Sequence, residues 1–249
     1  MFRLMKLRPP HGWSAVFWEL AVVTLGVLIA LGAQQWADER NWAGKVERSR
    51  TAIREELAQH YSWSVEWRAT TPCMLAQVER LQKRVLSSGS TLDPAPAFAE
   101  DHFSYVIRLP SKEYTRSVYD GALADAVVER FEPGFRGELN SHYAQTAVTE
   151  AMTRQNDNEQ QELFGLSRPL PLDPGVRYEL LRTLDRLRGR IEFMDLVSGQ
   201  LMDHVEKVRM VPPVAAVRKD LERFGTYRFC KAQGLPVRSL NAAMTAVPN

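Results

Sequence analysis

The sequence contains few of the residues on which small scaffolds and common catalytic centres depend. It has only two cysteines among 249 residues, Cys73 and Cys230, and they do not form a CxxC pair. It has no GxSxG, Walker-type or GxGxxG motif, and its five histidines include no HExxH pair. These absences exclude a small disulfide scaffold and argue against zinc, nucleotide and serine-hydrolase chemistry. We therefore expect no catalytic residues, no metal, no cofactor and no enzyme activity.

The sequence also lacks a large excess of either positive or negative charge. The formal net charge is +2, from 32 basic and 30 acidic residues. Such a balance gives no electrostatic argument for binding nucleic acid, and we expect no nucleic-acid partner. Hydrophobic residues form 45% of the chain, which is enough to fill the core of one large domain with or without an appendage.

The sequence does contain one long apolar run near the amino terminus. From Leu20 to Ala33, Thr24 is the only polar residue. The 18 steps from Trp18 to Trp36 rise roughly 27 Å in a helix, close to the ~30 Å hydrocarbon core of a bilayer. Glu19 lies in the first turn, where its carboxylate can reach headgroup water. The run predicts a transmembrane helix over residues 18–36, with the lipid bilayer as a partner.

Tryptophans flank this run as an aromatic belt would. The expected membrane-interface residues are Trp13, Trp18, Glu19, Trp36 and Trp42. An uncleaved signal anchor is favoured over a cleaved signal peptide, because helix-forming residues continue without a break into residues 37–57. Basic residues both precede and follow the run, so their distribution does not decide its orientation.

The two cysteines leave two alternatives, a pair of buried thiols or one disulfide. A Cys73–Cys230 disulfide would close a loop of 157 residues (230 minus 73) and contribute at most about 5 kcal/mol by loop entropy. It would also require an oxidising compartment such as the periplasm. Combined with the single predicted transmembrane helix, the disulfide reading agrees with residues 1–17 as a short cytoplasmic tail and with the main domain in the periplasm.

The remainder predicts an all-α fold, in which the transmembrane helix continues into an extramembrane helical bundle. We expect one helical domain over residues 37–234, with a linker near 167–175 and a loosely ordered tail over 235–249. A first helix over 37–69 would end before a second that begins at Pro72, and another would begin at Ser111. Segment 97–110 fits either a short strand or a helix end.

Residues 176–209 carry the clearest helical signal. Apolar positions alternate steps of four and three, as in a coiled coil, and Ser198 alone interrupts the stripe. Packing of this stripe inside the same domain is favoured over a dimer zipper. The stripe consists of Leu180, Leu184, Leu187, Ile191, Met194, Ser198, Leu201, Val205 and Val208.

Two groups of polar residues in the sequence are considered as candidate binding sites. Cations and tyrosines alternate in RLPSKEYTRSVYDG, which could bind an anionic ligand or could simply be the solvated face of a helix. The candidate ligand-binding residues are Arg108, Lys112, Tyr114, Arg116 and Tyr119. His60 and His142 lie beside tyrosines on helical faces, where satisfied interhelical histidines are the usual explanation.

The apolar segment resembles the start of a group of bacterial single-pass inner-membrane proteins of unknown function. The resemblance rests on Glu19-Leu20, the Gly-Val-Leu-Ile-Ala-Leu centre from Gly26 to Leu31, and Trp36. It covers about the first quarter of the chain, implies a membrane-anchored domain and carries over no catalytic residue.

These observations favour a binding or scaffold module for a protein partner in the cell envelope. The small residues Gly26 and Ala30 leave self-association open. A sensor of small anionic ligands built on residues 108–119 is the alternative from another class. An envelope hydrolase is a third, and it would require His, Asp or Ser side chains to converge.

Overall fold

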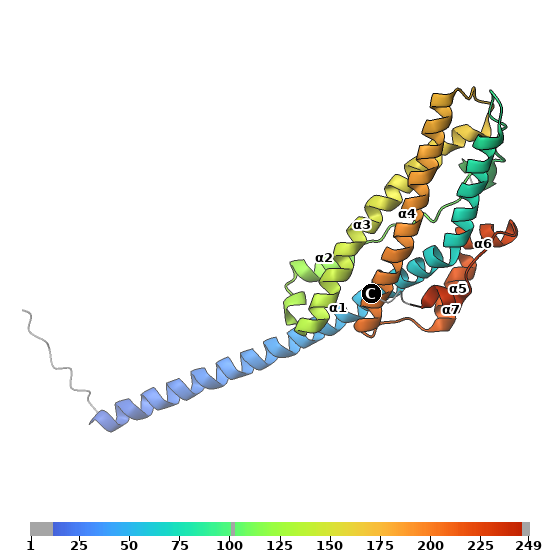
Figure 1. The fold of residues 1–249 in the computed structure, drawn as a ribbon. Helices are drawn as coiled ribbons and strands as arrows, with labels where there is room; N and C mark the ends of the chain where they lie inside the picture. Colours follow the sequence, from blue (N-terminus) through green and yellow to red (C-terminus); the bar gives the residue numbers. More distant parts are fainter. Residues whose placement is uncertain (1–11, 101–102, 246–249) are drawn as a thin grey trace, which may run out of the picture. The chain divides into compact units, whose positions relative to one another are not determined.

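The computed structural model describes residues 12–100 and 103–245, and within these ranges the fold is all-α, as expected (Figure 1). Two short antiparallel strands, β1 (Phe98–Glu100) and β2 (Phe103–Tyr105), pair with Phe98 opposite Tyr105. The described helices are α1 (Gly12–Ser87), α2 (Ser117–Ala124), α3 (Pro133–Leu163), α4 (Pro174–Lys207), α5 (Val214–Arg223), α6 (Gly225–Ala232) and α7 (Leu240–Met244).

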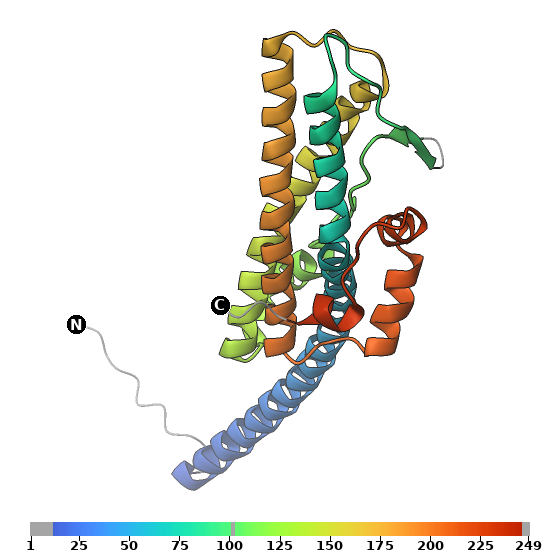
Figure 2. The ribbon, with the colours of Figure 1, turned by 45° about the vertical axis from the view of Figure 1, so that its right-hand side comes forward.

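The chain divides into two compact units, Met1–Ser49 and Arg50–Asn249. The described part of the first unit is helical throughout and belongs to α1. The second unit contains the end of α1 and every other element. In it, the end of α1 lies beside α3 and α4 (Figures 1 and 2), and these three helices form the bundle.

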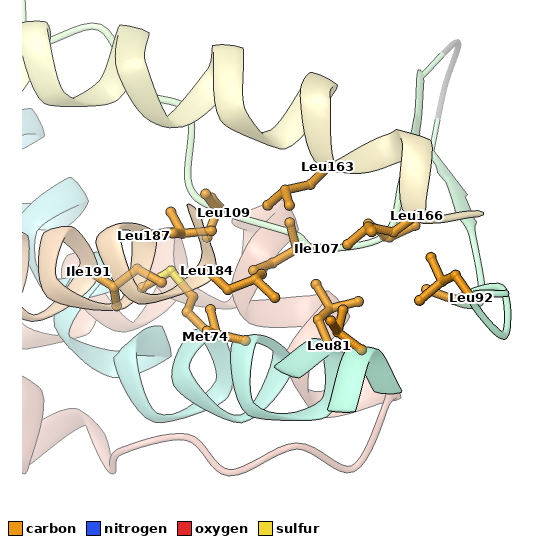
Figure 3. Close-up of a cluster of buried hydrophobic side chains, with 14 of the residues drawn as sticks. Met74, Leu81, Leu92, Ile107, Leu109, Leu163, Leu166, Leu184, Leu187 and Ile191 are labelled. Carbon is orange, nitrogen blue, oxygen red and sulfur yellow. The ribbon is translucent and has the colours of Figure 1, made fainter. Parts of the chain in front are cut away.

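A hydrophobic core fills the space between these helices. Side chains of α1, the end of α3, α4 and the segment after α1 point toward one another (Figure 3). The α4 stripe supplies Leu184, Leu187, Ile191 and Met194, all fully buried. Each such side chain stabilises the fold by roughly 2 kcal/mol. The stripe therefore packs inside its own domain.

The caps of α3 and α4 follow directly from the sequence. The Glu132 carboxylate accepts hydrogen bonds from the backbone N–H groups of Gly134 and Phe135, at 3.1 Å each, and Pro133 opens α3. Asp173 accepts from the N–H of Val176 at 2.9 Å in the same way, and Pro174 opens α4. An acidic cap followed by proline satisfies the N–H groups that a helix start leaves free.

The expected helix boundary at Pro72 is wrong, because α1 runs through it to Ser87. Proline has no N–H, so the carbonyl of Arg68 loses its helical donor, and the proline ring crowds that same carbonyl. Arg238 donates to this carbonyl and to the next one: its Nη1 bonds to the Arg68 oxygen at 3.1 Å and its backbone N–H to the Ala69 oxygen at 2.9 Å. The helix changes direction within the second unit (Figure 1) but continues.

Other boundaries differ from expectation where tertiary contacts dominate. Residues 111–116 are not helical, and α2 begins only at Ser117. The polar run before Leu163 is helical and belongs to α3. The linker near 167–175 hydrogen-bonds to the loop after α1, as in Leu92 N–H to Leu170 oxygen at 2.7 Å.

The segment after α6, expected to be loosely ordered, is packed over residues 235–245. Leu235 is buried beside the Cys73–Cys230 disulfide, and Ala243 of α7 is fully buried. Arg238 also forms a two-pronged ion pair with Asp195 of α4, at 2.5 and 2.9 Å. The segment is thus tied to both α1 and α4.

Candidate functional site

The first unit exposes an apolar surface that is unusual for a protein in water. One helix of the described chain is long and apolar enough to cross a membrane, and none of its most apolar window is buried. Every large hydrophobic side chain from Val16 to Leu31 is exposed, Trp18 by 72%. A soluble monomer rarely exposes a contiguous apolar patch of this size. The arrangement suits contact with lipid.

The predicted interface residues occupy both ends of this apolar stretch. Trp18, Glu19 and Trp36 are exposed, and the Arg40 guanidinium lies 5.5 Å from the Trp36 ring centre. Trp42 is half-buried, with the Lys45 ammonium 4.9 Å from its ring centre. The Trp13 side chain lies outside the described residues. Aromatic rings paired with cations are typical of the polar edge of a bilayer.

Cys73 and Cys230 form the disulfide that the sequence left as one of two alternatives. Their sulfurs are bonded, and both residues are fully buried. The bond joins α1, one residue after Pro72, to α6, and the Leu235 N–H donates to the Cys230 oxygen at 2.9 Å. The carboxy-terminal segment is therefore fixed to α1 both covalently and through Arg238.

Buried polar side chains form a seam between α1 and α3. We call Glu56, His60, His142 and Tyr143 the polar seam. His60 Nδ1 lies 3.0 Å from His142 Nε2, and the two rings stack with their centres 5.3 Å apart. The Tyr143 hydroxyl donates to the Glu56 carboxylate at 2.6 Å. All four side chains are at most 6% exposed.

Burial keeps both histidines neutral. It lowers the pKa of His60 from 6.5 to about 4, partly offset by the nearby Thr115 carbonyl. Burial also lowers the pKa of His142 well below its ordinary value, and the imidazoles of His60 and His204 lower it further. A single hydrogen bond between two neutral rings needs one ring as donor and the other as acceptor. The pair therefore shares one proton in the gap.

The polar seam also connects neighbouring elements. The Glu56 carboxylate accepts from the Val118 N–H in the first turn of α2, at 3.3 Å. The Tyr143 ring stacks on Tyr119 of α2, with ring centres 4.2 Å apart. Burial and the Glu56 carboxylate raise the pKa of the Tyr143 hydroxyl, so it stays protonated and can donate. The seam thus specifies how α1, α2 and α3 pack together.

A second buried carboxylate, Glu66, faces the start of α6. Burial raises its pKa, while the Lys112 ammonium, 3.7 Å away, and the backbone N–H groups of Tyr227 and Thr226 lower it. No side chain caps α6, so this carboxylate from α1 supplies the negative charge that a helix start favours. Lys112 also lies 4.4 Å from the ring centre of Phe224, the residue before α6.

The five candidate ligand residues are distributed over several separate contacts. Tyr114 and Tyr119 are buried, with Tyr114 beside His60 at 5.2 Å between ring centres. Lys112 contacts Glu66, and Arg116 pairs with Asp120 at 3.1 Å. Arg108 lies over the Tyr105 ring, 5.1 Å from its centre. Each of these side chains thus has its own partner in the fold, and among the described residues the five do not share a common contact.

Sequence reasoning missed the roles of Glu56, Glu66 and Arg238. The two glutamates could have been noticed in the sequence, because Glu56 and Glu66 interrupt the apolar positions of α1 and a buried charged residue needs a partner. Arg238 gives none. Within the described ranges, no three His, Cys, Asp or Glu side chains are placed to hold a metal ion.

In comparisons with known proteins, no family model, curated protein or solved structure matches the chain. The function must therefore be argued from the chain's own residues.

Proposed function

We propose that this protein is a single-pass protein of a bacterial inner membrane whose helical domain acts as a binding module for another envelope protein. The observation that carries the proposal is the exposed apolar helical stretch between Trp18 and Trp36. Transfer of such a surface to lipid removes it from water, and about 20 apolar residues suffice to span the hydrocarbon. The resemblance of its first quarter to bacterial single-pass proteins points the same way.

The Cys73–Cys230 disulfide supports a periplasmic location for the second unit. Disulfides persist in oxidising compartments and are rare in the bacterial cytoplasm. With a single span, the residues before Trp18 then lie in the cytoplasm.

Membrane insertion is tested by placing charge in the span. Leu25→Arg with Leu28→Arg replaces two favourable contributions by two that each cost about 2.5–3.5 kcal/mol at the helix centre. We expect the double variant to leave the membrane fraction, while wild type stays there after a carbonate wash. Leu196→Arg, an equally apolar exposed residue of α4, is the matched control and should remain membrane-bound. Wild type in the aqueous fraction without detergent would overturn the proposal.

Orientation is tested separately with carboxy-terminal reporter fusions. We expect an alkaline phosphatase fusion to be active and a fusion to green fluorescent protein to be dark, because the first folds only in the periplasm and the second only in the cytoplasm. The reverse pattern would contradict the periplasmic location but leave anchoring intact. A partner is then sought by cross-linking in intact cells.

The sensor alternative built on residues 108–119 receives little support, because its cations contact acidic or aromatic side chains of their own chain. The hydrolase alternative requires a nucleophile beside a base. Ser198 is fully buried in α4, and the buried imidazoles of the polar seam bond to each other. Neither Ser198 nor the two imidazoles are therefore placed to react with a substrate.

A further inference from the structure

A cleft in the second unit lies between the second half of α1, the segment around β1, and α6. Its volume is about 450 Å³, within the range of small-molecule sites. One wall is apolar and includes Phe98, Val106, Phe229 and Leu235. The Phe98 and Phe229 rings meet edge to face, with centres 5.0 Å apart, and join the β1 segment to α6.

The part of the lining that comes from α1 is largely cationic. Arg80, Lys83 and Arg84 of α1 line the cleft, and Asp93 is the one acidic residue among the described residues that line it. Arg84 pairs with Asp93 at 2.5 Å, and Lys83 pairs with Glu79 at 2.7 Å. Arg80 is exposed and pairs with no described residue. A guanidinium therefore remains available at the edge of an apolar cavity.

The apolar wall is held firmly in place. The Cys73–Cys230 disulfide fixes α6 to α1. Phe229 of α6 and Leu235, which follows α6, pack beside this disulfide. Gln77 also lines the cleft, and it is held by both backbone groups of Arg108: its Oε1 accepts from the N–H at 2.8 Å, and its Nε2 donates to the oxygen at 3.3 Å. Because this wall is already ordered, a ligand that binds in the cleft does not have to offset the entropic cost of ordering it.

We propose that this cleft binds a small amphiphilic anion, a molecule with a single apolar chain and a carboxylate or similar head. The chain would lie along Phe98, Phe229 and Leu235, and the head would bind the Arg80 guanidinium. Arginine suits this role because its planar N–H groups match a carboxylate in two parallel hydrogen bonds. The site goes beyond the proposed anchoring function, and it uses none of the five cation and tyrosine residues of 108–119.

The test uses the full-length protein in nanodiscs of phosphatidylcholine, with a dodecanoic acid that carries a photoreactive diazirine as the probe. After irradiation, labelled peptides are identified by mass spectrometry. We expect label on residues 77–87 and 225–235, and we expect dodecanoate to compete for it while dodecyltrimethylammonium does not. Label confined to residues 16–36 would mean that the probe reaches the protein only from the lipid, and would overturn the proposal.

Two variants distinguish a specific site from general adsorption. Arg80→Glu should lower labelling of the cleft by about fivefold or more, since it replaces attraction of the head by repulsion. Arg54→Glu makes the same charge change at another exposed position of α1 and should leave labelling unchanged. Ser87→Trp, which places a large ring on the cleft lining, should lower labelling without changing charge. Equal labelling of Arg80→Glu and Arg54→Glu, or equal competition by the cationic amphiphile, would refute the proposal.

Because anchoring is tested by fractionation, failure of this experiment leaves the proposed function standing. Conversely, a soluble protein that still takes label at residues 77–87 would retain the cleft without the membrane anchor.

Discussion

Acid should destabilise the second unit through the histidine pair of the polar seam. The pKa of buried His60 is lowered to about 4, whereas a histidine in an unfolded chain takes up a proton near pH 6.5. Between these two values the unfolded state binds more protons, so the free energy of unfolding falls as the pH falls. His60 contributes no penalty above pH 6.5, and its full penalty is reached near and below pH 4.

The magnitude follows from the difference between the two pKa values. A separation of roughly 2.5 units at about 1.4 kcal/mol per unit gives a loss of about 3 kcal/mol between pH 7 and pH 4 from His60 alone. His142 acts in the same direction, because its pKa is also lowered. The two rings are in contact, so their contributions are coupled and do not simply add.

The measurement is a series of urea titrations of the full-length protein in nonionic detergent, followed by far-ultraviolet circular dichroism. The comparison is with the double variant His60→Gln, His142→Gln, whose amides can preserve one hydrogen bond across the gap but do not titrate. We expect wild type to lose about 3 kcal/mol more than the variant between pH 7 and pH 4. Parallel pH profiles for the two proteins would refute the assignment of buried neutral imidazoles.

Three further changes have definite expected results in the same titrations. The stability of Glu66→Gln minus that of wild type should be more positive at pH 7 than at pH 4, because the raised pKa of Glu66 gives wild type stability that is lost as the pH rises; an equal difference at both values would contradict its burial as a carboxylate. Cys230→Ser should lose up to about 5 kcal/mol, and reduction of wild type should match it; a midpoint insensitive to reduction would exclude the disulfide. Arg238→Ala should cost about 2 kcal/mol, and about 1 kcal/mol less when combined with Pro72→Ala, which restores the missing N–H; strict additivity would show that Arg238 does not serve the proline.

The sequence was sufficient to predict the helical class, the long apolar helical segment near the amino terminus and the burial of the α4 stripe, because each depends on a pattern within one segment. The boundary at Pro72 was predicted wrongly by the same local logic, since the donors that rescue α1 come from a residue 166 positions away (238 minus 72).

The candidate sites were harder to predict for a related reason. The cations of residues 108–119 form a conspicuous cluster in the sequence, but Glu66, Asp120 and the Tyr105 ring neutralise or cover them in the fold. Arg80 is inconspicuous in the sequence, surrounded by Glu79, Gln82 and Lys83. Arg80 stands out only in the fold, where Lys83 and Arg84 are paired with acidic residues and Arg80 pairs with no described residue. The apolar wall beside it comes from α6, about 150 residues later (229 minus 80 is 149).

The segment after α5 therefore does more than complete the bundle. Arg238 allows α1 to continue past Pro72, and the disulfide one residue further on fixes α6 against the same helix. Since Phe229 of α6 forms the apolar wall of the cleft, the bend in α1 and the cavity depend on the same stretch of chain. A change that releases this stretch should open the cleft and weaken the bend together, while leaving the core around Leu184 and Leu187 intact. Greater amide exchange confined to residues 66–80 and 225–245 upon reduction would be the expected sign of this coupling.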